Sequence, residues 1–397
     1  MACPRNSLQS VQSFVAVSDF ISVNCNEIFM YSFFDYAYNG CLYLNNIVRH
    51  RHKRLSQLMI YATTACQSKC KHCNIWKKKV EHLSLDDIRQ VMESRCVTRH
   101  TTVGLEGGEF ILHPQAEEIM AWFHVHHPNY TLLSNCLAPR RVIKAVRLHH
   151  PHHLYVSLDG DRETYLRMRG RDGYDRVIQV VEALKDEVPL SLMFCLSPWN
   201  SFDDMAYVID VAKHYGVDVR IGIYGKMAYM VDADCKSASN ESGISNQFQQ
   251  TDLLTTTDFI AQIPRSIHGT QENFDFVALY DEWRNGRLKL RCQSILSSLV
   301  IHSNGDVPLC QNLETTIGNI HQQSLDEILN GKAACQTQCH YSKNCNDCWI
   351  NYHRKYDIIL LRNLERLLPK QIIEHFYGPY QWTDDSHTTY RQYFKKL

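Results

Sequence analysis

The feature that most constrains the fold is an alternation of short apolar segments with amphipathic segments between residues 57 and 224. The apolar segments have the length and composition of buried strands; they cover residues 57–63, 101–109, 130–135, 153–160, 189–197 and 217–224. The segments between them have a helical period, at residues 83–96, 114–126, 139–149, 174–186 and 201–216. Strands that alternate with helices form a parallel sheet with right-handed crossovers. The sequence therefore predicts an α/β fold, a partial (β/α)6 TIM-like barrel that is open on one side.

Residues that can carry chemistry lie at the ends of five of these strands. In parallel β/α folds the carboxyl ends of the strands meet at one edge, where the active site lies. The residues expected at this edge are Cys66, Cys70 and Cys73 after the first strand, "GGE" at 107–109, "SN" at 134–135, "SLDG" at 157–160 and "CLSPWN" at 195–200. This agreement predicts a single site at that edge.

The cysteines indicate metal sites rather than disulfides. The N-terminus lacks a basic region followed by a long apolar core, so we expect a cytoplasmic protein with reduced thiols. The chain has 16 cysteines, and two groups stand out. The first group is Cys66, Cys70 and Cys73, and the second is Cys292, Cys310, Cys335, Cys339, Cys345 and Cys348. Two such groups in a reducing compartment predict metal binding.

Two other classes of partner are disfavoured by composition. The formal net charge is zero, which argues against nucleic-acid binding driven by bulk charge. The chain contains no apolar run of about 18 residues, the length expected of a membrane-spanning helix. We therefore expect neither nucleic acid nor a membrane as a partner.

The first cysteine group has the spacing C-x3-C-x2-C, which supplies three thiolates. A structural zinc site takes four ligands. A [4Fe–4S] cluster has four irons that each normally take one thiolate, so three cysteines leave one iron open. Placed after the first strand of a β/α barrel, this motif resembles that of the radical SAM superfamily. His72 departs from the pattern, because an aromatic residue such as Tyr or Phe is frequent before the third cysteine.

The resemblance implies a mechanism and a set of cofactors. The open iron would bind S-adenosylmethionine, and the reduced cluster would cleave it to a 5′-deoxyadenosyl radical that takes hydrogen from a substrate. A reductant such as flavodoxin or ferredoxin would supply the electron. The residues that the resemblance places at the cofactor are Gly107, Gly108, Glu109, Ser134, Asn135, Ser157, Asp159 and Arg169. A scaffold role is equally open for Ser134, Asn135, Asp159 and Arg169.

The second cysteine group resembles the SPASM/twitch extension of the same superfamily. Cys292 and Cys310 flank "NGD", a hairpin signal between apolar runs, and we expect both at one end of a two-stranded ribbon. With the late pair Cys345 and Cys348 they would complete one auxiliary [4Fe–4S] cluster in a small α+β extension. Cys335 and Cys339 remain as spare thiols or as ligands of a partial second cluster. A zinc site without chemistry is the alternative for both groups.

The pattern divides the chain into five segments. We expect an unassigned N-terminal extension, a radical SAM core, a linker with a helix, an auxiliary cluster domain, and a C-terminal helix with a tail. Their expected limits are residues 1–55, 56–230, 231–285, 286–350 and 351–397.

The reaction class follows from the auxiliary cluster. A cluster with four cysteine ligands accepts or passes an electron, and the arrangement resembles that of twitch-bearing aminocyclitol dehydrogenases. This resemblance implies oxidation, or alternatively epimerisation, of a sugar, cyclitol or other small metabolite. The alternative is a SPASM-type maturase that modifies a ribosomal peptide or a protein. The sequence assigns no catalytic residue; Arg169, His113 and Tyr224 are candidates for a base by position only.

Overall fold

The computed structural model describes residues 33–49, residues 54–224 and, with gaps, residues 276–382. Within these residues a seven-stranded sheet has the order β6-β5-β4-β3-β2-β1-β8, and every pairing in it is parallel. Its strands are β1 (Gln57–Thr63), β2 (Thr102–Gly107), β3 (Tyr130–Ser134), β4 (His153–Ser157), β5 (Leu190–Leu196), β6 (Asp218–Ile223) and β8 (Ser298–Ile301). The partial barrel is therefore confirmed, with one strand more than expected.

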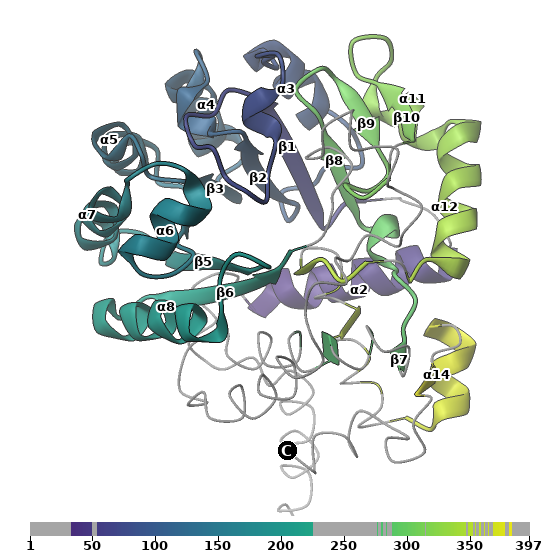
Figure 1. Ribbon diagram of the computed structural model, residues 1–397. Helices are drawn as coiled ribbons and strands as arrows, with labels where there is room; N and C mark the ends of the chain where they lie inside the picture. Colours follow the sequence, from purple (N-terminus) through teal and green to yellow (C-terminus); the bar gives the residue numbers. More distant parts are fainter. Residues whose placement is uncertain are drawn as a thin grey trace, which may run out of the picture.

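Helices cover the outer face of this sheet (Figure 1). They are α3 (Leu85–Met92), α4 (Ala116–His126), α5 (Pro139–His149), α6 (Arg162–Arg169), α7 (Tyr174–Leu184) and α8 (Phe202–Tyr215). Ser84 and Ser201 each close a capping box at a helix start, which satisfies backbone donors that the helix leaves free. The helix α6 was not predicted, and it lies in the crossover between β4 and β5.

The two faces of the sheet differ in character. Alternate strand residues such as Leu58, Val103 and Leu105 join the main hydrophobic core under the helices. On the other face Met59 and Tyr61 pack with Val300 in a small separate cluster.

The C-terminal part differs from the expected ribbon. Strand β8 pairs with β1 in the barrel sheet, and β9 (Asp306–Pro308) pairs with β10 (Thr316–Asn319) in an antiparallel pair. The edge of β1 offers unpaired backbone groups, and the fully buried strand β8 satisfies them. The turn itself forms as predicted, with Gly305 at φ 82° and the His302 N–H donating to the Asp306 carbonyl.

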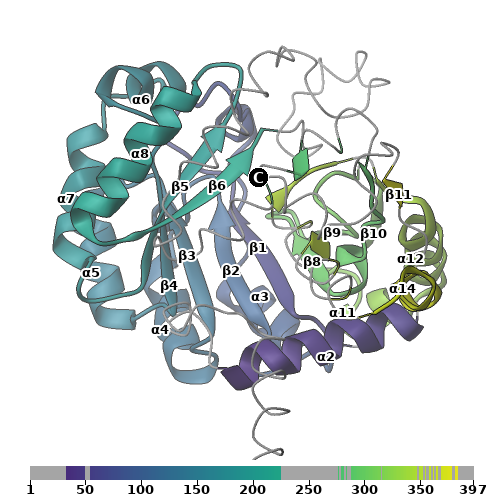
Figure 2. The same ribbon diagram turned by 90° about the horizontal axis from the view of Figure 1, so that it is seen from below.

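The remaining elements gather beside β8, as Figure 2 shows. They are η7 (Ser294–Leu296), α11 (Leu325–Asn330), α12 (Lys332–Asn344), α14 (Lys370–Tyr377) and the pair β7 (Leu288–Lys289) with β11 (Gln381–Trp382). Helix α2 (Phe33–Arg49) lies along this part, and Asn46 Nδ2 donates to the Leu296 carbonyl at 2.9 Å. The rest of the expected N-terminal extension, residues 1–32 and 50–53, and most of the expected linker lie outside the described residues. No helix in the described ranges has both the length and the apolar character that crossing a membrane requires.

Candidate active site

The loop that carries the first three cysteines follows β1 and is held by the end of α6. The Lys69 N–H donates to the Arg169 carbonyl at 2.8 Å, and the Lys71 N–H donates to the Met168 carbonyl at 2.9 Å. The Ser68 hydroxyl also donates to the Arg169 carbonyl, at 3.1 Å. These backbone bonds fix the shape of the loop independently of any bound group.

The three thiols lie close enough to influence one another. Burial, with a contribution from the neighbouring Cys70, raises the pKa of Cys66 to about 12 and that of Cys73 to about 11. Buried thiolates therefore need a positive partner here. Among the described residues no three His, Cys, Asp or Glu side chains converge on a single metal ion. A [4Fe–4S] cluster fits better, because each thiolate binds a separate iron.

The glycines of the "GGE" turn, which continues into η4 (Phe110–Leu112), pack against the start of the cysteine loop. Gly107 has φ 143°, and a Cβ atom on it would overlap the Thr63 carbonyl oxygen. A Cβ atom on Gly108 would overlap the Ala65 carbonyl oxygen, next to Cys66. Only glycine fits this close approach of two backbones.

Glu109 joins this turn to the end of β3. Its buried carboxylate accepts hydrogen bonds from Ser134 Oγ at 2.8 Å and from the Asn135 N–H at 2.7 Å. Burial raises the pKa of Glu109 to about 7 in spite of these bonds. The Asn135 amide Nδ2 lies 3.7 Å from Cys66 Sγ. Glu109, Ser134 and Asn135 are therefore one network beside the first cysteine.

Asp159 and Arg169 form a buried ion pair at 2.5 Å on the other side of the loop. Arg169 Nη1 lies 3.6 Å from Cys70 Sγ, so the pair places a positive charge beside that thiol. Burial and the nearby Arg169 charge lower the pKa of His72 to about 4, so His72 is neutral. Ser157 is buried at the end of β4, at the same edge of the sheet.

The second cysteine group is brought together in part. The Cys292 N–H donates to the Cys345 carbonyl at 2.8 Å. Burial raises the pKa of Cys292 and of Cys310, and the charges of Cys345 and Cys348 raise both further. These four thiols therefore share one neighbourhood. Cys335 and Cys339 are exposed instead, four residues apart on α12.

Three polar side chains of the lumen escaped the sequence reasoning. Gln311 Nε2 donates to the Tyr61 hydroxyl at 2.9 Å, which links the loop after Cys310 to β1. Glu106 lies opposite Tyr61 in the β1–β2 register. The period-two pattern of β2 was the available signal, because it places Glu106 on the face opposite Val103 and Leu105.

Of the base candidates named from position, His113 and Arg169 are already bonded within the protein. His113 Nε2 lies 2.8 Å from the Leu83 carbonyl, and its Nδ1 accepts the Gln115 N–H at 3.0 Å. Arg169 is paired with Asp159. Tyr224 follows β6 and packs edge-on against Trp199.

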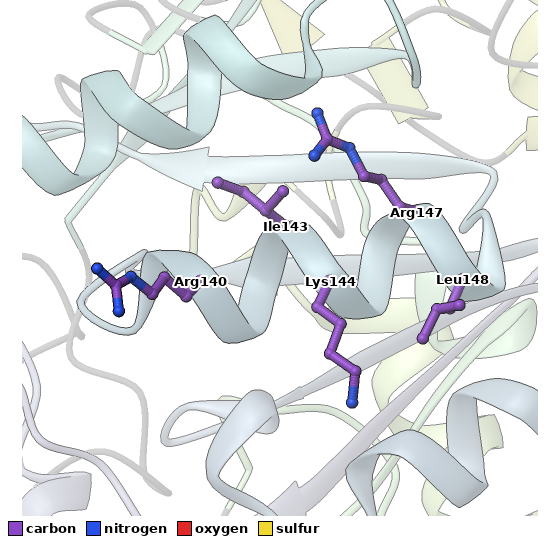
Figure 3. A pocket seen from close by; sticks show the side chains of 5 residues that line it. All are labelled: Arg140, Ile143, Lys144, Arg147 and Leu148. Atoms are coloured by element: carbon purple, nitrogen blue, oxygen red, sulfur yellow. The ribbon is translucent and has the colours of Figure 1, made fainter.

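A groove of about 520 Å³ lies on the outer side of α5 (Figure 3). It is lined by Arg140, Ile143, Lys144, Arg147 and Leu148. Lys144 pairs with Glu117 at 2.8 Å, and Arg147 pairs with Glu187 at 2.7 Å, so most of its positive charge is matched. The groove is on the helical layer and is separate from the cysteine loop.

Comparison with known proteins identifies both cysteine regions. Residues 60–212 match the family model of the radical SAM superfamily, and residues 292–349 match that of SPASM, an iron-sulfur cluster-binding domain. Comparison with curated protein sequences gives no significant match.

Solved structures with a similar fold include two forms of Streptococcus suis SuiB and the protein anSMEcpe. SuiB bound to S-adenosylmethionine is 15% identical with a TM-score of 0.54, over 83% of this chain and 78% of that chain. SuiB bound to precursor peptide SuiA is 14% identical with a TM-score of 0.56, over 88% and 82%. Native anSMEcpe with bound AdoMet is 16% identical with a TM-score of 0.51, over 86% and 96%. At these identities the likeness shows the fold.

Proposed function

We propose that this chain, which belongs to the radical SAM superfamily and carries a C-terminal SPASM domain, oxidises a peptide or protein by removing one of its hydrogen atoms. Membership in the superfamily implies cleavage of S-adenosylmethionine at a [4Fe–4S] cluster, auxiliary iron–sulfur chemistry in the SPASM domain, and an external reductant. When bound, the cluster supplies the electron that converts S-adenosylmethionine to methionine and a 5′-deoxyadenosyl radical.

The observation that carries the radical chemistry of this proposal is the cysteine loop after β1. Cys66, Cys70 and Cys73 are the proposed cluster ligands, since their thiols interact and need positive charge. The chain holds the loop through backbone bonds to Met168 and Arg169. It therefore presets the ligand positions before the cluster binds.

The proposed cofactor residues divide into contact and support roles. Gly107 and Gly108 bring the backbone of the turn next to the cysteine loop, where a ligand of the open iron would lie. Asn135 directs its amide toward Cys66. Glu109 and Ser134 bond to each other, so they position Asn135. Ser157 lies at the same edge of the sheet, and its contact with the cofactor stays a prediction.

The Asp159–Arg169 pair is proposed as a positioning pair. It holds a guanidinium beside Cys70, and the Asp159 carboxylate also accepts the Cys195 N–H at 3.2 Å. The pair thus connects the cysteine loop with β5. In this role the Asp159–Arg169 pair stabilises the cysteine loop rather than binding the substrate.

The auxiliary cluster is proposed to bind through Cys292, Cys310, Cys345 and Cys348. Their shared neighbourhood supports this choice, and the exposure of Cys335 and Cys339 on α12 supports a single cluster without them. The limits of the five segments stay predictions.

The substrate class is the finer part of the proposal. The SuiB structure with a similar fold is bound to precursor peptide SuiA, which supports a peptide or protein substrate here. The sugar, cyclitol or small metabolite expected from the sequence is the competing outcome of the test.

The test starts with anaerobic purification and reconstitution of the full chain. We expect about eight irons, as two [4Fe–4S] clusters require, and release of 5′-deoxyadenosine under reduction with S-adenosylmethionine. Cys66→Ala should lose about four irons and all cleavage, whereas Cys335→Ala, the matched control at an exposed thiol, should keep both. Zinc in place of iron, or cleavage by Cys66→Ala, would contradict the assignment.

A substrate screen then separates the two classes. The reconstituted enzyme is incubated with a random-sequence peptide library and, separately, with a small-metabolite extract. Stimulated release of 5′-deoxyadenosine together with peptides lighter by two hydrogen atoms supports the proposal. Stimulation by the metabolite extract alone would refute the peptide assignment.

A further inference from the structure

Glu106 is the acidic residue that β2 directs into the lumen of the barrel. Val103 and Leu105 of the same strand lie in the core beneath the helices. The alternation of a strand places Glu106 and Gly104 on the opposite face. Glu106 immediately precedes Gly107 and Gly108, so it lies at the edge where the cysteine loop begins.

The carboxylate of Glu106 lies next to Gly104, which has no side chain to occupy the space beside it. A Cβ atom placed on Gly104 would lie 3.6 Å from Glu106 Oε1 and 3.7 Å from Thr131 Oγ1, and it would press on Met59 Sδ at 2.7 Å. Any larger residue at position 104 would therefore displace its neighbours in the lumen. Glu106 is partly exposed.

No hydrogen bond or ion pair engages the Glu106 carboxylate within the part of the chain that the structure describes. Removal from bulk water is the only cause that raises its pKa, to about 7. Its register partner Tyr61 on β1 packs against His302 after β8, with ring centroids 6.0 Å apart. Burial lowers the pKa of His302 to about 4, so it brings no positive charge.

Glu106 is connected to both cysteine groups through its register partner Tyr61. Its register partner Tyr61 belongs to the small cluster against which Cys66 and Cys73 pack. Tyr61 also accepts a hydrogen bond from Gln311, the residue after Cys310. Tyr61 therefore joins Glu106 to the surroundings of both cysteine groups.

We infer that Glu106 is the catalytic base of the proposed oxidation, which this inference takes as its premise. The substrate carbon loses a hydrogen atom, which leaves in 5′-deoxyadenosine. The neighbouring O–H, N–H or S–H group loses its proton to Glu106 as a double bond forms, and an auxiliary cluster held by the second cysteine group would accept the remaining electron. The net reaction converts substrate and S-adenosylmethionine into the oxidised product, 5′-deoxyadenosine, methionine and a proton.

A carboxylate suits this task better than the other side chains at the site. An efficient base has a pKa close to the working pH, and burial without a partner brings a glutamate there. Glu109 also lies at this edge, but its two oxygens accept bonds from Ser134 and Asn135. For Glu106, by contrast, removal from water is the only cause of its raised pKa, and no hydrogen bond from the described residues opposes it.

The first experiment needs no substrate. Isotope-edited infrared titration of the oxidised, reconstituted enzyme carrying labelled glutamate would compare the full chain with Glu106→Gln and with the exposed control Glu118→Gln. We expect Glu106→Gln to remove a carboxyl that titrates near pH 7. A Glu106 signal that titrates near 4.5, as a solvated glutamate does, would overturn the inference.

The second experiment uses the random-sequence peptide library. Glu106→Gln should lower the ratio of oxidised peptide to 5′-deoxyadenosine by about 10²–10⁴-fold, the usual contribution of a general base. Glu106→Asp should restore part of the ratio and shift the pH profile, and Glu118→Gln should keep the wild-type ratio. An unchanged ratio in Glu106→Gln would refute the role. If wild-type enzyme releases 5′-deoxyadenosine but oxidises no peptide, the peptide assignment fails. The ratio of oxidised product to 5′-deoxyadenosine is then measured with the metabolite extract, and an unchanged ratio in Glu106→Gln would refute the role of Glu106.

Discussion

Replacing Arg169 with methionine tests whether a buried ion pair supports the cysteine loop. The side chains of Arg169 and Asp159 are 9% and 0% exposed, and their charged atoms lie 2.5 Å apart. Methionine keeps most of the apolar volume and removes the guanidinium. Asp159 is then left as a buried charge without its cation.

The size of the effect follows from this burial. Removing one partner of a buried pair costs about 3–5 kcal/mol of unfolding free energy. The matched control is Arg162→Met, because the Arg162–Asp175 pair is 55% and 75% exposed and exposed pairs contribute about 0–1 kcal/mol. Because the unfolding free energy of a domain is about 5–15 kcal/mol, Arg169→Met should be clearly less stable than Arg162→Met.

The assay is anaerobic urea unfolding of the reconstituted enzyme, with iron retained by each variant measured in parallel. Arg169→Met should unfold at lower urea than Arg162→Met and lose iron earlier. The double variant Asp159→Asn/Arg169→Met should recover part of the loss, because the stranded charge is gone. Equal unfolding curves for Arg169→Met and Arg162→Met would refute the reasoning.

Three further predictions concern other parts of the two sites. Gly107→Ala forces a side chain onto a backbone at φ 143° and against the Thr63 carbonyl, so it should lower stability by at least about 1–3 kcal/mol in thermal unfolding; an unchanged midpoint would contradict the close approach. Cys348→Ala should remove about four irons and Cys335→Ala none, as counted after reconstitution; equal counts would make the ligand set wrong. Glu106 has a pKa of about 7 in the fold against 4.5 for a solvated carboxyl, so its deprotonation weakens the fold as pH rises through this window. Glu106→Gln should therefore gain up to about 3 kcal/mol over wild type at a pH of about 8 and nothing at about 4, in urea titrations at both pH values; parallel pH profiles would show that the carboxylate is solvated.

The strands and helices of the barrel were predictable because they depend on local pattern. Helix α5 (Pro139–His149) and strand β1 (Gln57–Thr63) have the predicted limits, since a proline starts the one and a buried apolar run defines the other. Strand β8 was predicted as a strand, but its partner was wrong. The pairing of Ser298–Ile301 with β1 joins residues far apart in sequence, and no local signal specifies that choice.

The residues of the site likewise divide into those that the local sequence predicts and those that only the fold brings together. The spacing of Cys66, Cys70 and Cys73 lies within one short loop, so the sequence displays it directly. The bond between Gln311 and Tyr61 joins residues 250 positions apart, and only the fold brings them together. The separation of Cys335 and Cys339 from the other thiols likewise follows from exposure on a helix, which their spacing does not reveal.

Two glutamates three residues apart show where sequence reasoning ends. Burial raises the pKa of both Glu106 and Glu109 to about 7, so the direction and size of the shift do not separate them. Their partners do: Glu109 accepts hydrogen bonds from Ser134 and Asn135, whereas burial alone acts on Glu106. A carboxylate already bonded to the protein must break those bonds to take a proton from a substrate, and a carboxylate without such bonds need not. The strand period assigns Glu106 to the inner face, but only the hydrogen bonds of the fold distinguish a residue that holds a turn from one that can act on a substrate.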